Sequence, residues 1–164
     1  KIRKMYRRFR VLIMGKANSG KTTILQKICD TTEQPIILDQ NGNKVSIDHR
    51  SHVEQRGHHH IEHEVTFASN PAFVFHDSRG FEAGSVDEIQ AVHNFIESRG
   101  KSGDLEKQLH IIWYCIPTDG ARVLSPAEAA FFNRGTGNVP VIAVFTKWDG
   151  LVLKACNELR NQGM

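Results

Sequence analysis

The stretch "GKANSGKT" at 15–22 carries the residue types that hold a polyphosphate. Glycines at its two ends, Gly15 and Gly20, allow the backbone to curl so that successive N–H groups point inward around a phosphate. Lys21 supplies a positive charge for the β- and γ-phosphates, and the hydroxyl of Thr22 suits Mg²⁺. Because an apolar run precedes the stretch and an amphipathic run follows it, it lies between an expected strand and an expected helix. That context favours nucleotide binding over a chance match.

A second stretch, "HDSRG" at 76–80, follows the hydrophobic run "AFVF". Asp77 is positioned there to reach Mg²⁺ through a water, and the N–H of Gly80 to reach the γ-phosphate. Taken alone, this sequence is also that of an ordinary turn. Its place after a hydrophobic run, downstream of the phosphate stretch, favours the role in nucleotide binding.

A third stretch, "FTKWDG" at 145–150, ends another hydrophobic run. The carboxylate of Asp149 can accept hydrogen bonds from both N1–H and the exocyclic amine of guanine. Adenine has no N1–H and would leave the carboxylate unpaired, which discriminates strongly between the purines. Lys147 would lay its stem over the purine face. An exposed loop with a salt bridge also fits these residues alone, but the order and spacing of the three stretches favour a guanine site.

The elements that must position these stretches follow from the hydrophobic pattern. Apolar runs predict strands and helical spacing predicts helices, with Ser85 and Ser125 as helix caps, Pro126 as a first helical residue and Gly135 just past a helix end. The predicted strands are 9–14, 61–68, 71–77, 109–116 and 139–145, and the predicted helices are 22–30, 85–98, 125–135 and 151–162. This alternation indicates an α/β fold with a mostly parallel sheet and helices on both faces.

Two segments depart from the simple alternation. The runs 61–68 and 71–77 are separated only by a short turn, so they predict an antiparallel hairpin. Residues 31–60 are polar and predict a long loop, within which Asn41-Gly42 signals a turn and leaves a small hairpin open. Ligands bind at the carboxyl ends of the strands in such sheets, where all three stretches should therefore lie.

The three stretches together resemble the G-domain of the translation-factor-class GTPases, from Arg10 to about Gln162. The first, third and fourth G-boxes of that family read "GKANSGKT", "DSRG" and "TKWD" in this chain. The resemblance implies a three-layer, Ras-like P-loop NTPase with a six-stranded sheet whose second strand is antiparallel. The segments "FVFHDSRGFEAGS", "IIWYCI" and "PVIAVFTKWD" look similar to fungal G-domain proteins related to the TrmE, Era, septin and AIG-type GTPases.

The resemblance implies a site for GTP or GDP with Mg²⁺. Its nucleotide-binding residues would be Ala17, Asn18, Ser19, Gly20, Lys21, Thr22, Thr23, Asp77, Gly80, Thr146, Lys147 and Asp149. Thr22 and Asp77 would hold the metal. Lys21, Asn18, Gly80 and His60 would take part in catalysis.

Several positions depart from the family pattern. Thr146 stands where the family usually has an asparagine that braces the phosphate loop and the base. No threonine occurs between Glu33 and Val65, so the switch threonine that normally binds Mg²⁺ has no counterpart. Thr66 lies too deep in a predicted strand to replace it. His60 falls at that position, and Ser46 and Ser51 lie in the same loop.

Two further departures concern catalysis and the end of the fold. Phe81 follows the glycine of the third box, where an apolar side chain cannot orient water; we interpret it as a packing residue. The fifth box is absent. We therefore expect it, with the last strand and helix of the family fold, to lie beyond the C-terminus. Residues 1–164 are interpreted as a single G-domain, in which 1–8 form a basic arm.

Phosphoryl transfer needs positive charge near the transferred group. In relatives with the same form of first box, the asparagine can ligate K⁺, and Asn18 matches it. The alternative is that Asn18 serves an unusual backbone angle. The histidine group 58–60 could hold water or charge, although a solvated loop also fits. Three alternatives are weaker. Arg79 could act as an internal arginine finger, and Glu82 could bind a catalytic water. The histidines of 58–63 could hold a structural zinc.

The composition is that of a soluble globular domain, with 40% hydrophobic and 24% charged residues. Lys1, Arg3, Lys4, Arg7, Arg8 and Arg10 account for much of the net charge of +3. We interpret them as a solvated arm and find no strong signal for nucleic acid or membrane.

Cys29, Cys115 and Cys156 form no metal- or redox-type pair, which favours reduced, buried thiols and a cytoplasmic location.

Two functions from different classes remain. In the first, the protein hydrolyses GTP to GDP and phosphate and acts as a molecular switch for an effector protein, with residues 31–62 and 78–90 as moving segments. In the second, it is a low-turnover module that assembles into a homodimer across its nucleotide face. The absent switch threonine and Phe81 favour the second function. An ATP-using enzyme is disfavoured by "TKWD".

Overall fold

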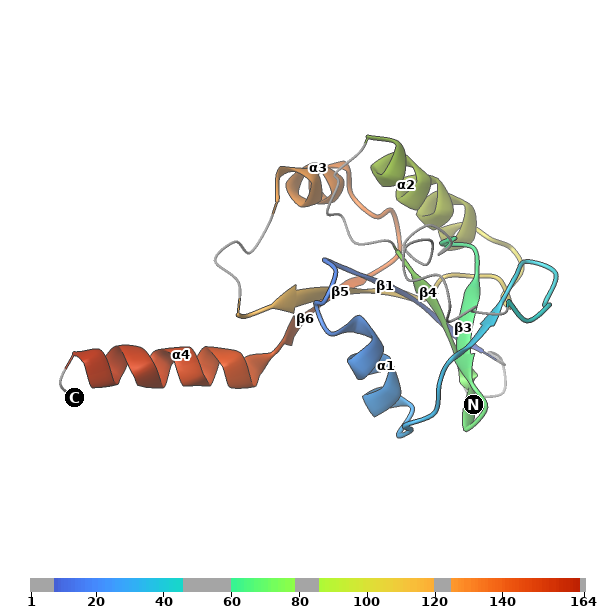
Figure 1. Ribbon diagram of the computed structural model, residues 1–164. Coiled ribbons are helices and arrows are strands. Elements are labelled where there is room, and N and C mark those ends of the chain that lie inside the picture. The colour runs from blue at the N-terminus through green and yellow to red at the C-terminus, as the bar shows by residue number, and fades with distance from the viewer. Residues whose placement is uncertain (1–7, 46–59, 79–85, 120–124, 163–164) are drawn as a thin grey trace.

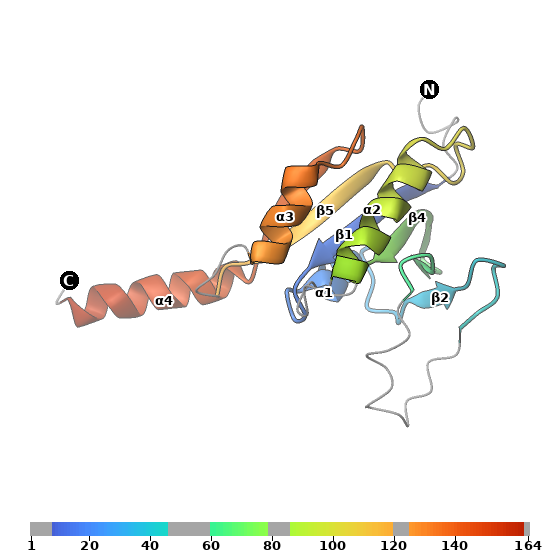
Figure 2. The same cartoon turned by 90° about the horizontal axis from the view of Figure 1, so that it is seen from above.

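The computed structural model describes residues 8–45, 60–78, 86–119 and 125–162. A six-stranded sheet in the order β2-β3-β4-β1-β5-β6 forms the middle layer. Helices α2 and α3 cover one face of the sheet and α1 lies on the other (Figures 1 and 2). The elements in chain order are β1 (Phe9–Gly15), α1 (Lys21–Ile28), β2 (Ile36–Leu38), β3 (Glu64–Phe67), β4 (Asn70–Asp77), α2 (Val86–Gly100), β5 (Ile111–Pro117), α3 (Pro126–Arg134), β6 (Val141–Thr146) and α4 (Trp148–Asn161). This three-layer α/β architecture confirms the predicted fold class.

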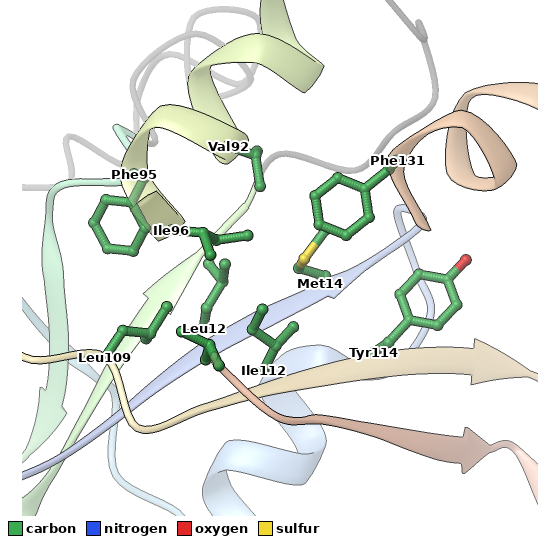
Figure 3. Close-up of a cluster of buried hydrophobic side chains, with 10 residues drawn as sticks. Leu12, Met14, Val92, Phe95, Ile96, Leu109, Ile112, Tyr114 and Phe131 are labelled. Atoms are coloured by element: carbon green, nitrogen blue, oxygen red, sulfur yellow. The ribbon is translucent and has the colours of Figure 1, made fainter. Parts of the chain in front are cut away.

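The core divides into two clusters because successive side chains of a strand point to opposite faces of the sheet. On β1, Leu12 and Met14 face the cluster under α2 and α3, whereas Val11 and Ile13 face the cluster under α1. All four are fully buried, as expected for a strand with neighbours on both sides. Figure 3 shows the first cluster, in which Phe131 from α3 reaches down towards Met14. The central strand therefore anchors the loop that follows it.

The predicted hairpin is present, but the sheet contains a strand that the sequence pattern did not predict. β3 and β4 pair antiparallel, and β2 adds to the outer edge of β3, also antiparallel. The antiparallel strand is β3, within the predicted 61–68, and it is the third along the chain because β2 precedes it. β2 has only three residues, Ile36–Leu38, which is too short for hydrophobic periodicity to reveal. An antiparallel bridge between Leu38 and Lys44 closes the small hairpin at Asn41-Gly42.

The first residues of the described chain correct the interpretation of a solvated basic arm. Arg10 is 5% exposed, and its guanidinium lies 2.7 Å from a carboxylate oxygen of Glu64 and 3.2 Å from Nε2 of His76. It is buried because β1 begins at Phe9, so that Arg10 already lies inside the sheet. Arg8 remains exposed, and residues 1–7 lie outside the described part.

The helix ends follow local sequence signals. Ser125 caps α3 by accepting a hydrogen bond from the N–H of Glu128, whose side chain in turn accepts from the N–H of Ser125. Pro126 and Gly135 lie at the two ends of this helix, as predicted. The predicted cap of α2 at Ser85 lies outside the described residues. Among the described helices, none combines the length and the apolar character needed to cross a membrane.

The last helix, α4, begins at Trp148, three residues earlier than predicted, and extends away from the sheet (Figure 1). None of its residues is buried, although it is amphipathic. Consequently Cys156 is exposed, contrary to the prediction of three buried thiols; Cys29 and Cys115 are buried. Cys156 does lie in a helix, but that helix has no buried residue.

Candidate functional site

A cleft of about 850 Å³ opens at the carboxyl ends of β1, β4 and β6. It is lined by residues 18–24, Lys27, Asp77 and residues 144–149. All three motif stretches thus contribute to one cavity, although more than 120 residues separate the first from the last. This arrangement follows from the topology, because parallel strands bring the loops after them to the same edge of the sheet.

The loop between β1 and α1 has the backbone of a phosphate cradle. Gly15 has φ 143° and Gly20 has φ 84°, both in the region that favours glycine. A β-carbon at position 15 would also stand 2.6 Å from the carbonyl oxygen of Cys115, so no larger residue fits there. Asn18 has φ 58°, a left-handed conformation that asparagine tolerates better than most residues. Asn18 therefore has the unusual backbone angle that the sequence analysis gave as its alternative role.

The ammonium group of Lys21 is held at the mouth of this loop. Its Nζ donates to the carbonyl of Gly15 at 3.1 Å and to that of Lys16 at 3.0 Å. An ammonium has three N–H donors, so a further one remains for an anionic oxygen. Lys21 is also the first residue of α1, where the unpaired N–H groups and the helix dipole favour negative charge. Charge and amide donors therefore converge on the same end of the cleft.

A neutral thiol lies beneath the cradle. Burial raises the pKa of Cys115 to about 11, and the positive charge of Lys21 offsets only part of this effect. The side chain therefore remains protonated at neutral pH and adds no negative charge under the loop.

The third stretch lines the same cleft through the end of β6, through Lys147 and through the start of α4. Lys147 has φ 56° and caps α4, so Asp149 lies in the first turn of that helix and not in a loop as predicted. Nζ of Lys147 lies 2.8 Å from Oδ2 of Asp119, which follows β5. The hydroxyl of Thr118 donates to the carbonyls of Thr146 and Lys147 at 2.9 and 3.0 Å. The segment after β5 thus fixes the backbone of the third stretch, 145–150.

The residues expected to hold Mg²⁺ lie in this cleft. Thr22, in the first turn of α1, and Asp77, at the end of β4, both line it. Ser78 is held against the sheet by a hydrogen bond from its N–H to the carbonyl of Ile13 at 3.1 Å, which fixes the backbone beside Asp77. A hydroxyl and a carboxylate are the hard oxygen ligands that Mg²⁺ prefers, so the donor set fits this ion.

Some predicted site residues are not brought to the cleft. Ala17 lies in the loop but does not line the cavity, and His60 is exposed, with its ring 5.7 Å from that of His63. Within the described ranges, no group of three or more potential ligands could hold a metal such as zinc. The remaining candidates lie outside the described residues: Ser46, Ser51, His58, His59, Arg79, Gly80, Phe81 and Glu82.

Five cleft residues were not among those predicted. Ile24 and Lys27 lie on α1, Val144 and Phe145 lie near the end of β6, and Trp148 begins α4. Helical spacing from Thr23 to Lys27 could have indicated that Lys27 shares the face of the helix that meets the cleft. Phe145 and Trp148 are 62% and 63% exposed, so two aromatic side chains border the site.

Comparison with known proteins supports the fold. No protein-family model matches this sequence, and no curated protein matches it. Among solved structures, the chain is similar to the septin GTPase domain from Chlamydomonas reinhardtii, with a TM-score of 0.51 and 18% sequence identity. The similarity covers 94% of this chain and 58% of that one. At this identity the likeness shows that the two chains share a fold, and it says nothing about activity.

Proposed function

We propose that the protein binds guanine nucleotides and hydrolyses GTP to GDP and phosphate with Mg²⁺, acting as a molecular switch. The observation that carries the proposal is the gathering of three separate sequence motifs around one cleft. The septin GTPase domain, whose fold this chain shares, is named for the same activity. The chain spans 58% of that protein, so the comparison supports the fold and the proposal rests on the site.

The two parts of the cleft have different proposed tasks. The cradle, with Gly20 and the ammonium of Lys21, would bind the phosphates, since it presents donors and positive charge. Asp149 would bind the guanine base, because it lines the same cavity as the cradle. Lys147, held by Asp119, would lie along the purine. Adenine has no N1–H for this carboxylate to accept from, so guanine would be preferred.

The chemistry of phosphoryl transfer is mainly positioning and charge stabilisation. Mg²⁺, when bound by Thr22 and Asp77, would neutralise charge on the β- and γ-phosphate oxygens. Lys21 would stabilise the same charge directly. Asn18 is the proposed ligand of a K⁺ ion that adds further positive charge, while Gly80 and His60 remain proposed contributors from the neighbouring segments.

The experiment that tests the proposal measures binding and turnover together. Calorimetric titration with GDP, GTP and ATP should give tight binding of both guanine nucleotides and weak binding of ATP. Phosphate release from GTP should require Mg²⁺ and be faster in KCl than in NaCl. Equal affinity for ATP and GTP would contradict the base-recognition assignment. Guanine-nucleotide binding without phosphate release would favour the alternative below.

The alternative is a low-turnover module that assembles into a homodimer across its nucleotide face. One observation favours it. Thr66, the first threonine after Glu33, lies in β3, and its hydroxyl donates to the carbonyl of Phe73 at 3.2 Å. It is therefore engaged within the sheet and cannot supply the missing ligand for Mg²⁺. Light scattering in the presence of GTP and GDP would reveal nucleotide-dependent dimers, which a monomeric switch would not form.

The proposed compartment is the cytoplasm. Cys29, Cys115 and Cys156 are all free thiols in the structure, which suits a reducing environment. An effector protein would bind the segments expected to move with the nucleotide, 31–62 and 78–90.

A further inference from the structure

A buried carboxylate lies directly behind the phosphate cradle. Glu128, near the start of α3, is 1% exposed. Its Oε1 accepts a hydrogen bond from the hydroxyl of Tyr114 on β5, and its Oε2 accepts from the N–H of Ser125. The same Oε2 lies 3.8 Å from Nζ of Lys16. Figure 3 shows the ring of Tyr114 within the core, with its oxygen directed away from the other labelled side chains.

These contacts keep Glu128 ionised. Burial on its own would raise the pKa of this carboxyl group, but the hydrogen bonds from Tyr114 and Ser125 and the positive charge of Lys16 hold the pKa below its ordinary value. A buried charge that is paired and hydrogen-bonded is stable, whereas the same charge without its partners is strongly destabilising. The carboxylate is therefore a fixed negative point to which Lys16 is attracted.

Lys16 connects this point to the cradle through its own backbone. It is the second residue of the stretch 15–22, and its carbonyl accepts from Nζ of Lys21 at 3.0 Å and from the N–H of Ser19 at 3.2 Å. The side chain of Lys16 reaches Glu128 while its carbonyl holds the ammonium proposed to bind phosphate. The orientation of the Lys16 carbonyl thus depends both on its own hydrogen bonds and on where the side chain of Lys16 is held.

We infer that Glu128 is a positioning residue for the phosphate cradle: by holding the side chain of Lys16, it fixes the carbonyl that orients the ammonium of Lys21. This inference rests on the proposed function, since it concerns the same nucleotide site. It also assigns a role to α3, which does not line the cleft. Tyr114 contributes by holding Glu128 in place from the sheet.

The test compares Glu128→Gln and Lys16→Met with Ser125→Ala. Glu128→Gln removes the charge that attracts Lys16 and keeps the shape of the side chain. Ser125→Ala removes the hydroxyl that caps α3 but keeps the N–H of residue 125, the hydroxyl of Tyr114 and the charge of Lys16 around Glu128, so it controls for loss of helix stability. Glu128→Gln and Lys16→Met should each weaken GDP binding by roughly tenfold. The double variant should be no weaker than either single one, because both remove one interaction.

A readout without nucleotide separates this inference from the proposed function. In ¹H–¹⁵N spectra of the free protein, Glu128→Gln should shift the amide signals of Ser19, Gly20 and Lys21, whereas Ser125→Ala should leave them in place. If the wild type fails to bind GDP but these shifts occur, the proposed function is wrong and the positioning of the loop stands. If the wild type binds GDP and Glu128→Gln alters neither the affinity nor the loop signals, the inference is wrong.

Discussion

The side chain of Thr146 lies against the backbone of Gly20, so the end of β6 packs on the phosphate loop. A β-carbon built on Gly20 would stand 3.6 Å from Cβ of Thr146. Thr146 is 8% exposed, and its hydroxyl has no hydrogen-bond partner in the part of the chain that the structure describes. In the family that the sequence resembles, an asparagine braces the loop at this position. Here, in the part of the chain that the structure describes, the hydroxyl of Thr146 makes no such hydrogen bond to the loop.

Replacing Thr146 by valine should stabilise the nucleotide-free protein. Valine has nearly the same shape, and the change removes a buried hydroxyl without a described partner. A buried unsatisfied polar group costs about 1 kcal/mol or more, so the free energy of unfolding should rise by about 1 kcal/mol. Urea unfolding of the two proteins measures this difference. A decrease of similar size would mean that the hydroxyl is bonded after all.

Lys21→Ala should abolish nucleotide binding. The variant loses the ammonium that the carbonyls of Gly15 and Lys16 hold at the cradle. Calorimetric titration with GDP measures the effect, and Lys154→Ala, which removes an exposed cation on α4, is the control for net charge. If Lys21→Ala binds GDP within about threefold of the wild-type affinity, a difference in binding free energy of roughly 0.7 kcal/mol, the cradle does not bind the phosphates.

Asp149→Asn should change the preferred base from guanine to xanthine. The amide can donate where the carboxylate only accepts, which suits the carbonyl that xanthine carries in place of the guanine amine. Competition between GDP and xanthosine diphosphate measures the preference, and Glu158→Gln on the exposed part of α4 is the matched control. An unchanged preference would show that another group reads the base.

Much of this fold could be predicted from short signals in the sequence. The turn at Gly15 and Gly20, the cap at Ser125 and the apolar run of β1 each specify local structure by sterics or hydrogen bonding, and the structure contains all three. The convergence of Lys21 and Asp149 on one cleft followed from the parallel topology. Local rules succeed at these positions because the relevant contacts are made within a few residues or along a single strand.

Other features depend on contacts between distant segments and could not be predicted. Ile36–Leu38 forms a strand only because the edge of β3 is available for pairing. The burial of Arg10 depends on Glu64 and His76, which lie on two other strands. The link between Lys16 and Glu128 joins residues more than a hundred positions apart, and neither residue type signals it. Hydrophobic periodicity describes one helix or strand at a time, so it does not predict contacts between residues on different elements.

Asn18→Gly should remove any stimulation of phosphate release by K⁺ and leave GDP binding intact. Glycine adopts the observed φ of 58° without strain and lacks the amide proposed to ligate the ion. Asn18→Ala is the less suitable variant, because alanine in the left-handed region costs about 1 kcal/mol and would disturb the loop itself. Phosphate release in KCl and NaCl measures the effect. An undiminished response to K⁺ in Asn18→Gly would exclude Asn18 as a ligand of the ion.

The protein should lose stability as the pH falls from about 6.5 to about 4, because His76 is buried in its neutral form. Burial, and secondarily the charge of Arg10, lowers the pKa of His76 to about 4. The groups that face it are Arg10 on β1, Glu64 on β3 and Arg99 on α2, and its Nδ1 lies 3.0 Å from the carbonyl of Ile61. Between these pH values the unfolded chain binds a proton that the folded protein does not. Protonation of His76 in the unfolded chain therefore lowers the free energy of unfolding by about 3 kcal/mol at pH 4 and has no effect above pH 6.5.

His76→Gln separates this residue from the other histidines. A glutamine can accept from Arg10 and donate to the carbonyl of Ile61 as the neutral imidazole does, but it does not titrate. The dependence of unfolding free energy on pH between 4 and 6.5 should therefore become shallower. It should not vanish, because burial also lowers the pKa of His93 and of His110. If His76→Gln keeps the slope of the wild type, His76 is not the residue that the fold holds neutral.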